Sequence, residues 1–233
     1  MTGRMLIEMA LACGGTLAAF ALARALSARL GHPPWGSPVL IAALLVAAGL
    51  ALIGVPAARY GAAALPLRWL LGPALVALAL VIDGNRQALR TQALPVLVAV
   101  GGGMAVGVGT AIGLARLLGL DAQLRDAVAV KTLSTPFAVA IMAATGGPVA
   151  LAAAIAVLTG IIGAVLVPPM FDRLRITSVA GRALGLGTAA HIVGTDWLTR
   201  RDPRAGGLSA LAMALAGTLA ALLLPPAWSW LAG

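Results

Sequence analysis

The longest uncharged stretch of the chain reads TLSTPFAVAIMAATGGPVALAAAIAVLTGIIGAVLVPPMF and runs from Thr132 to Phe171. It is about twice as long as the roughly 20 apolar residues that one helix needs to cross the hydrocarbon core of a bilayer. Near its middle stand Gly146, Gly147 and Pro148. Glycine permits a sharp turn and proline suits the first turn of a helix, so the stretch predicts two apolar helices that reverse direction at this hinge.

The composition of the whole chain agrees with a membrane protein. Of its 233 residues, 61% are hydrophobic and 10% are charged, whereas an ordinary soluble domain has about 25% charged residues. The single cysteine, Cys13, excludes a disulfide-linked secreted scaffold. The 16 Lys and Arg residues stand singly or in pairs between apolar runs. We therefore expect them to anchor the chain at lipid headgroups, and we expect no nucleic-acid binding.

Charged residues divide the chain into eight apolar elements that leave no room for a water-soluble domain. We expect these elements at residues 5–24, 37–55, 65–83, 93–115, 127–145, 148–171, 182–196 and 205–224. The predicted fold class is all-α, a polytopic integral membrane protein with one domain over residues 1–233.

Two features of this arrangement leave alternatives open. The segments Ser37–Ala43 and Gly147–Ala153 are similar, which raises the hypothesis of two repeat halves, 1–120 and 121–233, a construction common in secondary transporters. The first element begins near Arg4 and, like a signal peptide, has small residues near its end. We prefer a retained span.

The first of two unusually polar segments begins at Lys131. Polar groups inside lipid are costly unless they face a protein-lined or wet cavity. Lys131, Ser134 and Thr135 fall on one helical face, at i, i+3 and i+4. Pro136 follows; it lacks a backbone N–H and disfavours helical backbone at the residue before it, so we expect a helix break here.

The second polar segment also combines a polar stripe with helix-weakening residues. The stripe consists of Thr188, His191 and Thr195. We expect helix breaks at Gly185, Gly187 and Gly194. A helix restarting after such a break would offer free N–H groups, which suit a carboxylate. Hydroxyls, a lysine and such a helix end together favour a small organic anion as the ligand.

Each of these residues also has a structural interpretation. Serine and threonine in membrane helices often bond to their own helix or join neighbouring helices. Lys131 could extend to the membrane surface, and His191 could fill the core or act as a proton relay. Asp83 suits the end of the third element, but intramembrane carboxylates are candidates for ion coupling, so we single out Asp83 and Asp196.

Glycine spacing within residues 93–115 predicts a helix-packing face. The pairs Gly103/Gly107 and Gly109/Gly113 have the separation that lets membrane helices touch, either inside one chain or across a dimer. Enzyme motifs are missing from the sequence: there is no HExxH, no GxSxG and no Walker lysine loop. Two distant histidines and one cysteine make no metal site, so we expect no enzyme and no cofactor, apart from a coupling proton or sodium ion.

Several segments, in a match from about Ser37 to Pro225, resemble the LrgB/CidB family of bacterial membrane proteins. They are Leu71–Ala74, Lys131–Ala138, Leu158–Ala164 and Gly181–Thr195. The resemblance implies a fold like that of cation/proton antiporters and bile-acid transporters, with inverted repeats and crossed discontinuous helices. It implies the bacterial inner (cytoplasmic) membrane and a small LrgA/CidA-type membrane partner. We also expect a homo-oligomer such as a dimer.

The resemblance implies two kinds of activity. Some family members are described as antiholin-like or holin-like modulators of murein hydrolase export and lysis, and others move small carboxylates such as glycolate, glycerate or pyruvate. This chain departs from the family pattern at Ala140 and Ala143, where acidic residues are common, at Val81–Asp83, where Pro-Leu-Tyr is usual, and at Asp196–Leu198, which replaces a small residue and an acidic run.

Our leading hypothesis is a carrier of a small monocarboxylate such as pyruvate, glycolate or lactate, with the holin-like activity as the alternative. The expected substrate contacts are Lys131, Ser134, Thr135, Thr188, His191 and Thr195.

Overall fold

The computed structural model describes residues 3–232, which form helices joined by short segments, without a strand in that range. Five of the described helical stretches are long and apolar enough to cross a membrane, and a sixth crossing results if one bent helix pair counts as a span. The five are Gly3–Arg29, Leu65–Gly84, Leu89–Leu117, Val149–Arg173 and Pro203–Leu231. The predicted all-α, multi-pass membrane fold is confirmed.

The chain divides into two compact units, residues 1–74 and 75–233. The boundary between these units does not coincide with the predicted repeat boundary at residue 120, and the two repeat halves stay a prediction. In the first unit α1 packs along α2 and contacts α3 and α4. Its helices are α1 (Gly3–Arg29), η1 (Pro34–Gly36), α2 (Pro38–Leu52), α3 (Ala57–Ala63) and α4 (Leu65–Trp69); α5 (Leu71–Gly84) continues into the second unit.

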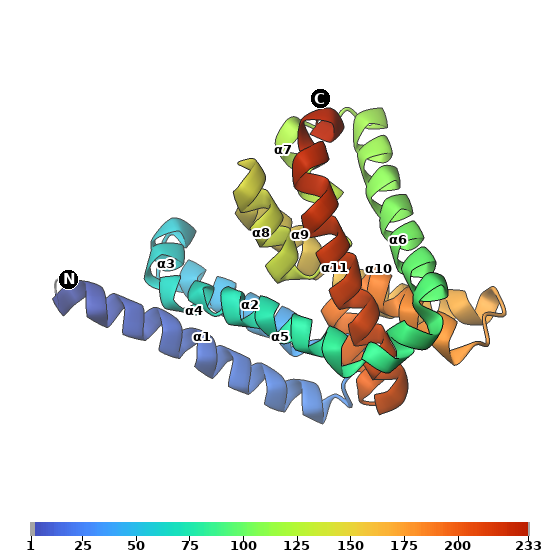
Figure 1. Ribbon diagram of the computed structural model, residues 1–233. Helices are drawn as coiled ribbons and strands as arrows, with labels where there is room; N and C mark the ends of the chain where they lie inside the picture. Colours follow the sequence, from blue (N-terminus) through green and yellow to red (C-terminus); the bar gives the residue numbers. More distant parts are fainter. Residues whose placement is uncertain (1–2, 233) are drawn as a thin grey trace. The chain divides into compact units, whose positions relative to one another are not determined.

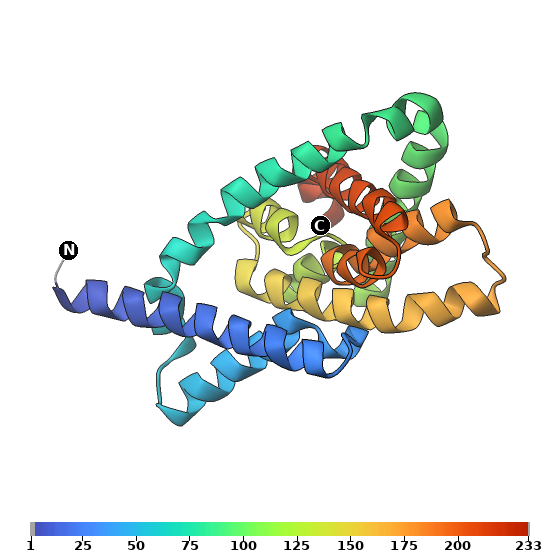
Figure 2. The ribbon, with the colours of Figure 1, turned by 90° about the horizontal axis from the view of Figure 1, so that it is seen from below.

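The second unit is a bundle with α10 at its centre. α10 packs against α9, α11 and α6, and α11 also contacts α8. Figure 1 shows α11 standing between α8 and α6, and Figure 2 shows the same bundle along another direction. Its helices are α6 (Arg86–Leu117), α7 (Ala122–Ala129), α8 (Thr135–Thr145), α9 (Val149–Arg173), α10 (Val179–Thr199) and α11 (Pro203–Ala232).

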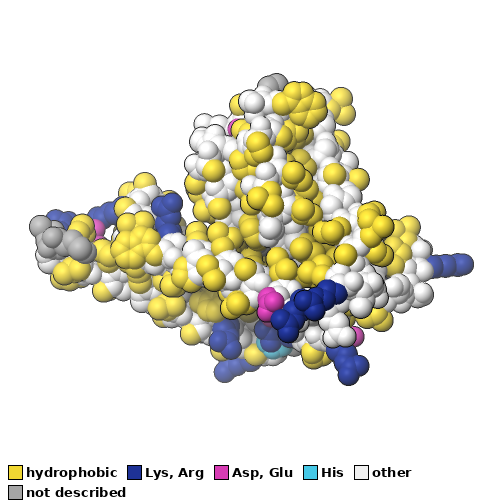
Figure 3. Space-filling model, in the orientation of Figure 1, with side chains coloured by type: hydrophobic (Ala, Val, Ile, Leu, Met, Phe, Trp, Pro, Cys, Tyr) yellow, Lys and Arg dark blue, Asp and Glu magenta, His cyan; other side chains and the backbone are white. Residues whose placement is uncertain are grey.

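Small residues make the close helix contacts of this bundle. A Cβ atom added at Gly187 of α10 would strike the backbone carbonyl of Ser209 on α11, and one added at Gly217 would strike the ring of Phe137. In membranes, such close approach allows van der Waals packing to hold helices together. Many large apolar side chains lie on the outside, as Leu94, 73% exposed, illustrates. Figure 3 shows hydrophobic side chains covering the upright helices, as a lipid-facing surface requires.

The predicted hinge after α8 is confirmed. Gly146 ends α8 with a left-handed backbone (φ 74°), and α9 begins at Val149. Two of the eight expected elements are interrupted, as their polar segments predicted, and a bend follows a third. Residues 37–55 extend beyond α2, which is bent by 118° from α3, and residues 127–145 and 182–196 are interrupted helices. These last two contain the polar segments singled out above.

Candidate functional site

The first interruption lies between α7 and α8, over residues 130–134. Two side chains of this turn, Val130 and Leu133, are almost completely buried and pack into the core of the bundle. Their burial leaves the intervening Lys131 and Thr132 half-buried. Ser134 has extended backbone (φ −63°, ψ 147°) and precedes the first turn of α8.

The interruption precedes Pro136, contrary to our expectation that this proline would break a continuous helix. Pro136 lies in the first turn of α8, and Thr135 before it is already helical. A proline in the first turn loses no hydrogen bond, because the first N–H groups of a helix have no partner within it. Pro136 therefore lies within the first turn of the second helix, which begins at Thr135, and the first helix ends earlier, at Ala129.

The second interruption is a single residue, His191, within α10. Its φ of 35° and ψ of −124° are non-helical, and a positive φ is unfavourable for a side chain with a Cβ atom. The ring occupies space left by Gly160 of α9: a Cβ atom there would lie 2.5 Å from His191 Cε1. Neither ring nitrogen has a hydrogen-bond partner among the described residues. The backbones of Lys131 and Ala156 interact with the ring without completing a hydrogen bond.

The glycines of α10 do not break the helix, contrary to our expectation. Gly185, Gly187 and Gly194 all lie in helical backbone. They serve close packing instead: a Cβ atom at Gly185 would lie 2.8 Å from the ring of Phe171, and one at Gly187 would meet the backbone of α11. The predicted positions of the helix break were therefore wrong by a few residues. The break lies at His191, and the glycines instead make contacts between helices.

A pocket of about 420 Å³ opens beside the first interruption, within the second unit. Its walls come from α6, from the turn between α7 and α8, from α9 and from α10. Its charged and hydroxyl-bearing lining residues and two of its glycines are Gly103, Gly107, Lys131, Thr132, Thr159 and Thr188. One cation and three hydroxyl groups thus converge on a space otherwise walled by small and apolar residues.

The polar groups of this pocket differ in whether they have an ion-pair or hydrogen-bond partner. Lys131 makes no ion pair with a described residue, and the Oγ1 atom of Thr132 is buried without a hydrogen-bond partner. Thr188 Oγ1 donates to the carbonyl of Leu184 at 2.8 Å, so its hydroxyl offers only an acceptor to the pocket. The arrangement therefore has a positive charge in the pocket wall and, next to it, a buried O–H donor without a partner.

The predicted site residues divide into two groups. Lys131 and Thr188 line the pocket. Ser134, Thr135 and Thr195 lie outside its lining: Ser134 is 3% exposed without a hydrogen-bond partner for Oγ, and Thr195 bonds to Ser209 at 2.9 Å between hydroxyl oxygens. His191 is also outside the lining. A substrate contact at any of these four residues, Ser134, Thr135, Thr195 and His191, stays a prediction.

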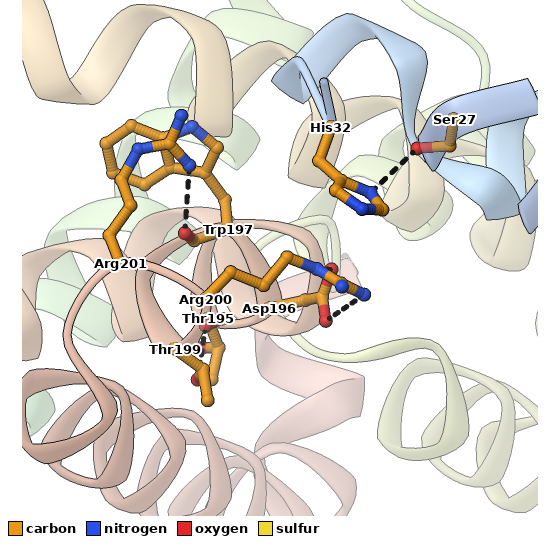
Figure 4. A network of polar contacts seen from close by, with 8 residues as sticks. All are labelled: Ser27, His32, Thr195, Asp196, Trp197, Thr199, Arg200 and Arg201. Atoms are coloured by element: carbon orange, nitrogen blue, oxygen red, sulfur yellow. Dashed lines mark hydrogen bonds and ion pairs between the residues drawn. The ribbon is translucent and has the colours of Figure 1, made fainter. Parts of the chain in front are cut away.

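The two candidate ion-coupling acids lie in exposed ion pairs. Asp83 pairs with Arg86 at 3.9 Å, and Asp196 pairs with Arg200 at 2.9 Å. Figure 4 shows the Asp196 pair and the neighbouring Arg201, whose guanidinium stacks on the ring of Trp197 at 4.2 Å. Neither acid lines the pocket, so a role in coupling stays a prediction for both.

Sequence reasoning did not select Thr132 or Thr159. Both residues could have been noticed in the sequence, because Thr132 stands beside Lys131 and Thr159 lies in the Leu158–Ala164 segment that carried part of the family resemblance. The spacing rule selected Ser134 instead, because it assumed that the helix continues through Lys131. Among the described residues, no group of three or more His, Cys, Asp or Glu side chains could hold a metal ion.

Comparison with known proteins gives one family and several relatives. The model described as "LrgB-like family" matches residues 16–230. Protein YxaC of Bacillus subtilis (strain 168), described as uncharacterized, is 29% identical over 192 residues, which cover 82% of this chain and 84% of YxaC. Protein YwbG of the same organism, also uncharacterized, is 28% identical over 183 residues, 78% of this chain and 81% of YwbG.

A plant relative has a named transport activity. The chloroplast protein named plastidal glycolate/glycerate translocator 1, from Arabidopsis thaliana, is 38% identical over 73 residues. The similar region covers 31% of this chain and 14% of the plant protein. No solved structure matches the chain.

Proposed function

This chain belongs to the LrgB-like family, and we propose that it is a secondary carrier of a small monocarboxylate such as pyruvate, glycolate or lactate. The observation that carries the proposal is Lys131, a lysine with no ion pair to a described residue, in the wall of a pocket inside a membrane-spanning bundle. A charge in such surroundings is costly, and an anionic substrate would neutralise it.

The neighbouring groups suit a carboxylate. Lys131 would provide the positive charge, and the hydroxyl of Thr132 would donate to a carboxylate oxygen. The helix α8 begins a few residues later, at Thr135, and its first N–H groups carry the positive end of the helix dipole. The plant relative named for glycolate and glycerate supports the same substrate class.

The two interrupted helices support a carrier in preference to an enzyme. Carriers commonly bind substrate near the bilayer midplane, where discontinuous helices expose backbone groups, and then move one part of the fold against another. We propose no catalytic step and no cofactor; a proton or a sodium ion would couple transport. The proposed setting is the bacterial inner membrane, with a homo-oligomer and a small LrgA/CidA-type membrane partner.

Counterflow in liposomes tests the proposal. The purified chain, with and without an LrgA/CidA-type partner, is reconstituted into vesicles loaded with unlabelled glycolate or pyruvate and a bulkier trapped dye. We expect labelled glycolate or pyruvate to enter with saturation and to be competed by other small monocarboxylates, while the dye is retained. Dye release without saturation would contradict the carrier and favour a holin-like or antiholin-like function in lysis.

A further inference from the structure

Two glycines of α6 form one wall of the pocket beside Lys131. A Cβ atom added at Gly107 would lie 2.9 Å from Cγ2 of Thr132, and one added at Gly103 would lie 3.1 Å from Cγ2 of Thr188. Both threonines line the pocket, as do both glycines. The wall is therefore already in contact with two polar residues of the site, one from each interrupted helix.

We infer that Gly103 and Gly107 set the largest substrate that the pocket accepts. A methyl group at Gly107 would displace the Thr132 side chain or occupy the same space, because α6 is kinked at Gln92 but is regular helix around Gly107 and cannot move aside locally there. Either change narrows the pocket where a substituent of the acid would lie. The inference rests on the proposed function and assigns its size discrimination to α6, separately from carboxylate recognition by Lys131.

The same helix provides matched controls. A Cβ atom at Gly102 or Gly109 would have no other heavy atom within 4 Å among those considered. The substitutions Gly102→Ala and Gly109→Ala therefore make the same chemical change in α6 without touching the pocket. The effect of added volume at Gly107 can thus be separated from the effect of replacing a glycine in this helix.

The experiment measures how a series of unlabelled acids competes with labelled glycolate in counterflow. The series runs from glycolate through lactate and glycerate to 2-hydroxybutyrate and 2-hydroxyvalerate. We expect Gly107→Ala to raise the inhibition constant of the largest competing acid about 10-fold relative to that of glycolate, the size of effect that one methyl group produces in a binding pocket. Gly109→Ala is expected to keep the size profile of the unsubstituted protein.

A double variant tests the contact itself. Thr132→Ser keeps the hydroxyl and removes the Cγ2 atom that the new methyl group would meet. We expect Gly107→Ala with Thr132→Ser to restore the competition by larger acids. If Gly107→Ala alone does not fold, the double variant is expected to recover a single peak in size-exclusion chromatography, and Gly103→Ala with Thr188→Ser repeats the competition test at the other contact.

Three results would overturn the inference: an equal loss for every acid in Gly107→Ala, an unchanged size profile, or the same profile change in Gly109→Ala. Failure of both double variants to restore folding or competition would also overturn it. These results differ from failure of the proposed function, in which the unsubstituted protein would show no saturable carboxylate counterflow.

Discussion

The two interrupted helices place their polar residues in different surroundings. The turn between α7 and α8 presents Lys131 and Thr132 to a pocket, whereas the break in α10 places His191 where only 1% of the residue is exposed. The pocket is lined by Lys131 and Thr132 of the first interruption and by Thr188 of α10, whereas His191 and Thr195 are buried between helices. Residues with the same chemistry in the sequence therefore have different expected roles.

The second interruption also supports the first. The His191 ring lies against the backbone of Lys131 and fills the space beside Gly160. The unfavourable backbone angles of His191 persist because packing on several sides determines them. We therefore propose His191 as a positioning residue and Lys131 as a substrate contact, and the following variants test that distinction.

The largest effect is expected from Gly187→Ala, in the second interrupted helix, where α10 packs against α11. The new methyl group would meet the backbone carbonyl of Ser209, which cannot rotate away as a side chain can. We expect loss of about 3 kcal/mol or more of folding free energy, and thus little monodisperse protein in size-exclusion chromatography. Gly102→Ala is the control and should behave as the unsubstituted chain. Normal folding of Gly187→Ala would show that α10 and α11 are less closely packed than described.

A smaller and different effect is expected from Lys131→Met, which keeps most of the length of the side chain and removes its charge. Hydrogen bonds to a charged group contribute about 1.5–3 kcal/mol, so the half-saturation concentration for glycolate should rise about 10- to 100-fold. The thermal unfolding midpoint should change little, because Lys131 makes no ion pair with a described residue. Unchanged uptake would show that Lys131 does not bind the substrate.

His191→Ala is expected to lower stability by about 2 kcal/mol, because it empties the space beside Gly160 and keeps a Cβ atom at positive φ. His191→Gly empties the same space but relaxes the backbone, so its loss should be about 1 kcal/mol smaller. Thermal unfolding of the two purified variants compares them. If His191→Ala instead raised the half-saturation concentration as much as Lys131→Met does, at an unchanged unfolding midpoint, His191 would be a substrate contact.

The smallest effect is expected from Thr195→Val. This variant keeps the side-chain shape and removes the hydroxyl that bonds Ser209 across α10 and α11. Hydrogen bonds between membrane helices contribute about 0.6 kcal/mol on average, so a loss of about 1 kcal/mol or less is expected. Ser209→Ala should cost a similar amount, and the double variant less than the sum of the two. Strict additivity in the unfolding measurements would mean that the two hydroxyls do not interact.

The sequence predicted the broad arrangement because composition and hinge residues act locally. Uncharged length indicated the spans, and Gly146 with Pro148 indicated the reversal before α9. Lys131 could be singled out because it lies inside the expected apolar element 127–145, where a charge is rare. Each of these signals depends on residues that are neighbours in the chain.

The rest of the site depends on contacts between distant residues. Gly187 suggested a helix break, but its partner on α11, Ser209, is invisible to a local pattern. Apart from the family resemblance of its segment, Thr159 is one hydroxyl in an apolar run, and no local pattern indicated that α9 faces a pocket. Helical spacing from Lys131 failed for the same reason, because the helix had already ended at Ala129.

We propose that carboxylates bind at the first interruption, and protection of a cysteine placed in the pocket tests this claim. Thr159→Cys, in a chain whose native cysteine is removed by Cys13→Ala, would be labelled with a thiol reagent in the presence of glycolate or its uncharged amide. We predict that glycolate slows labelling with saturation, that the amide does not, and that Lys131→Met abolishes the protection. Equal labelling with and without glycolate in a variant that still shows saturable counterflow would contradict the claim.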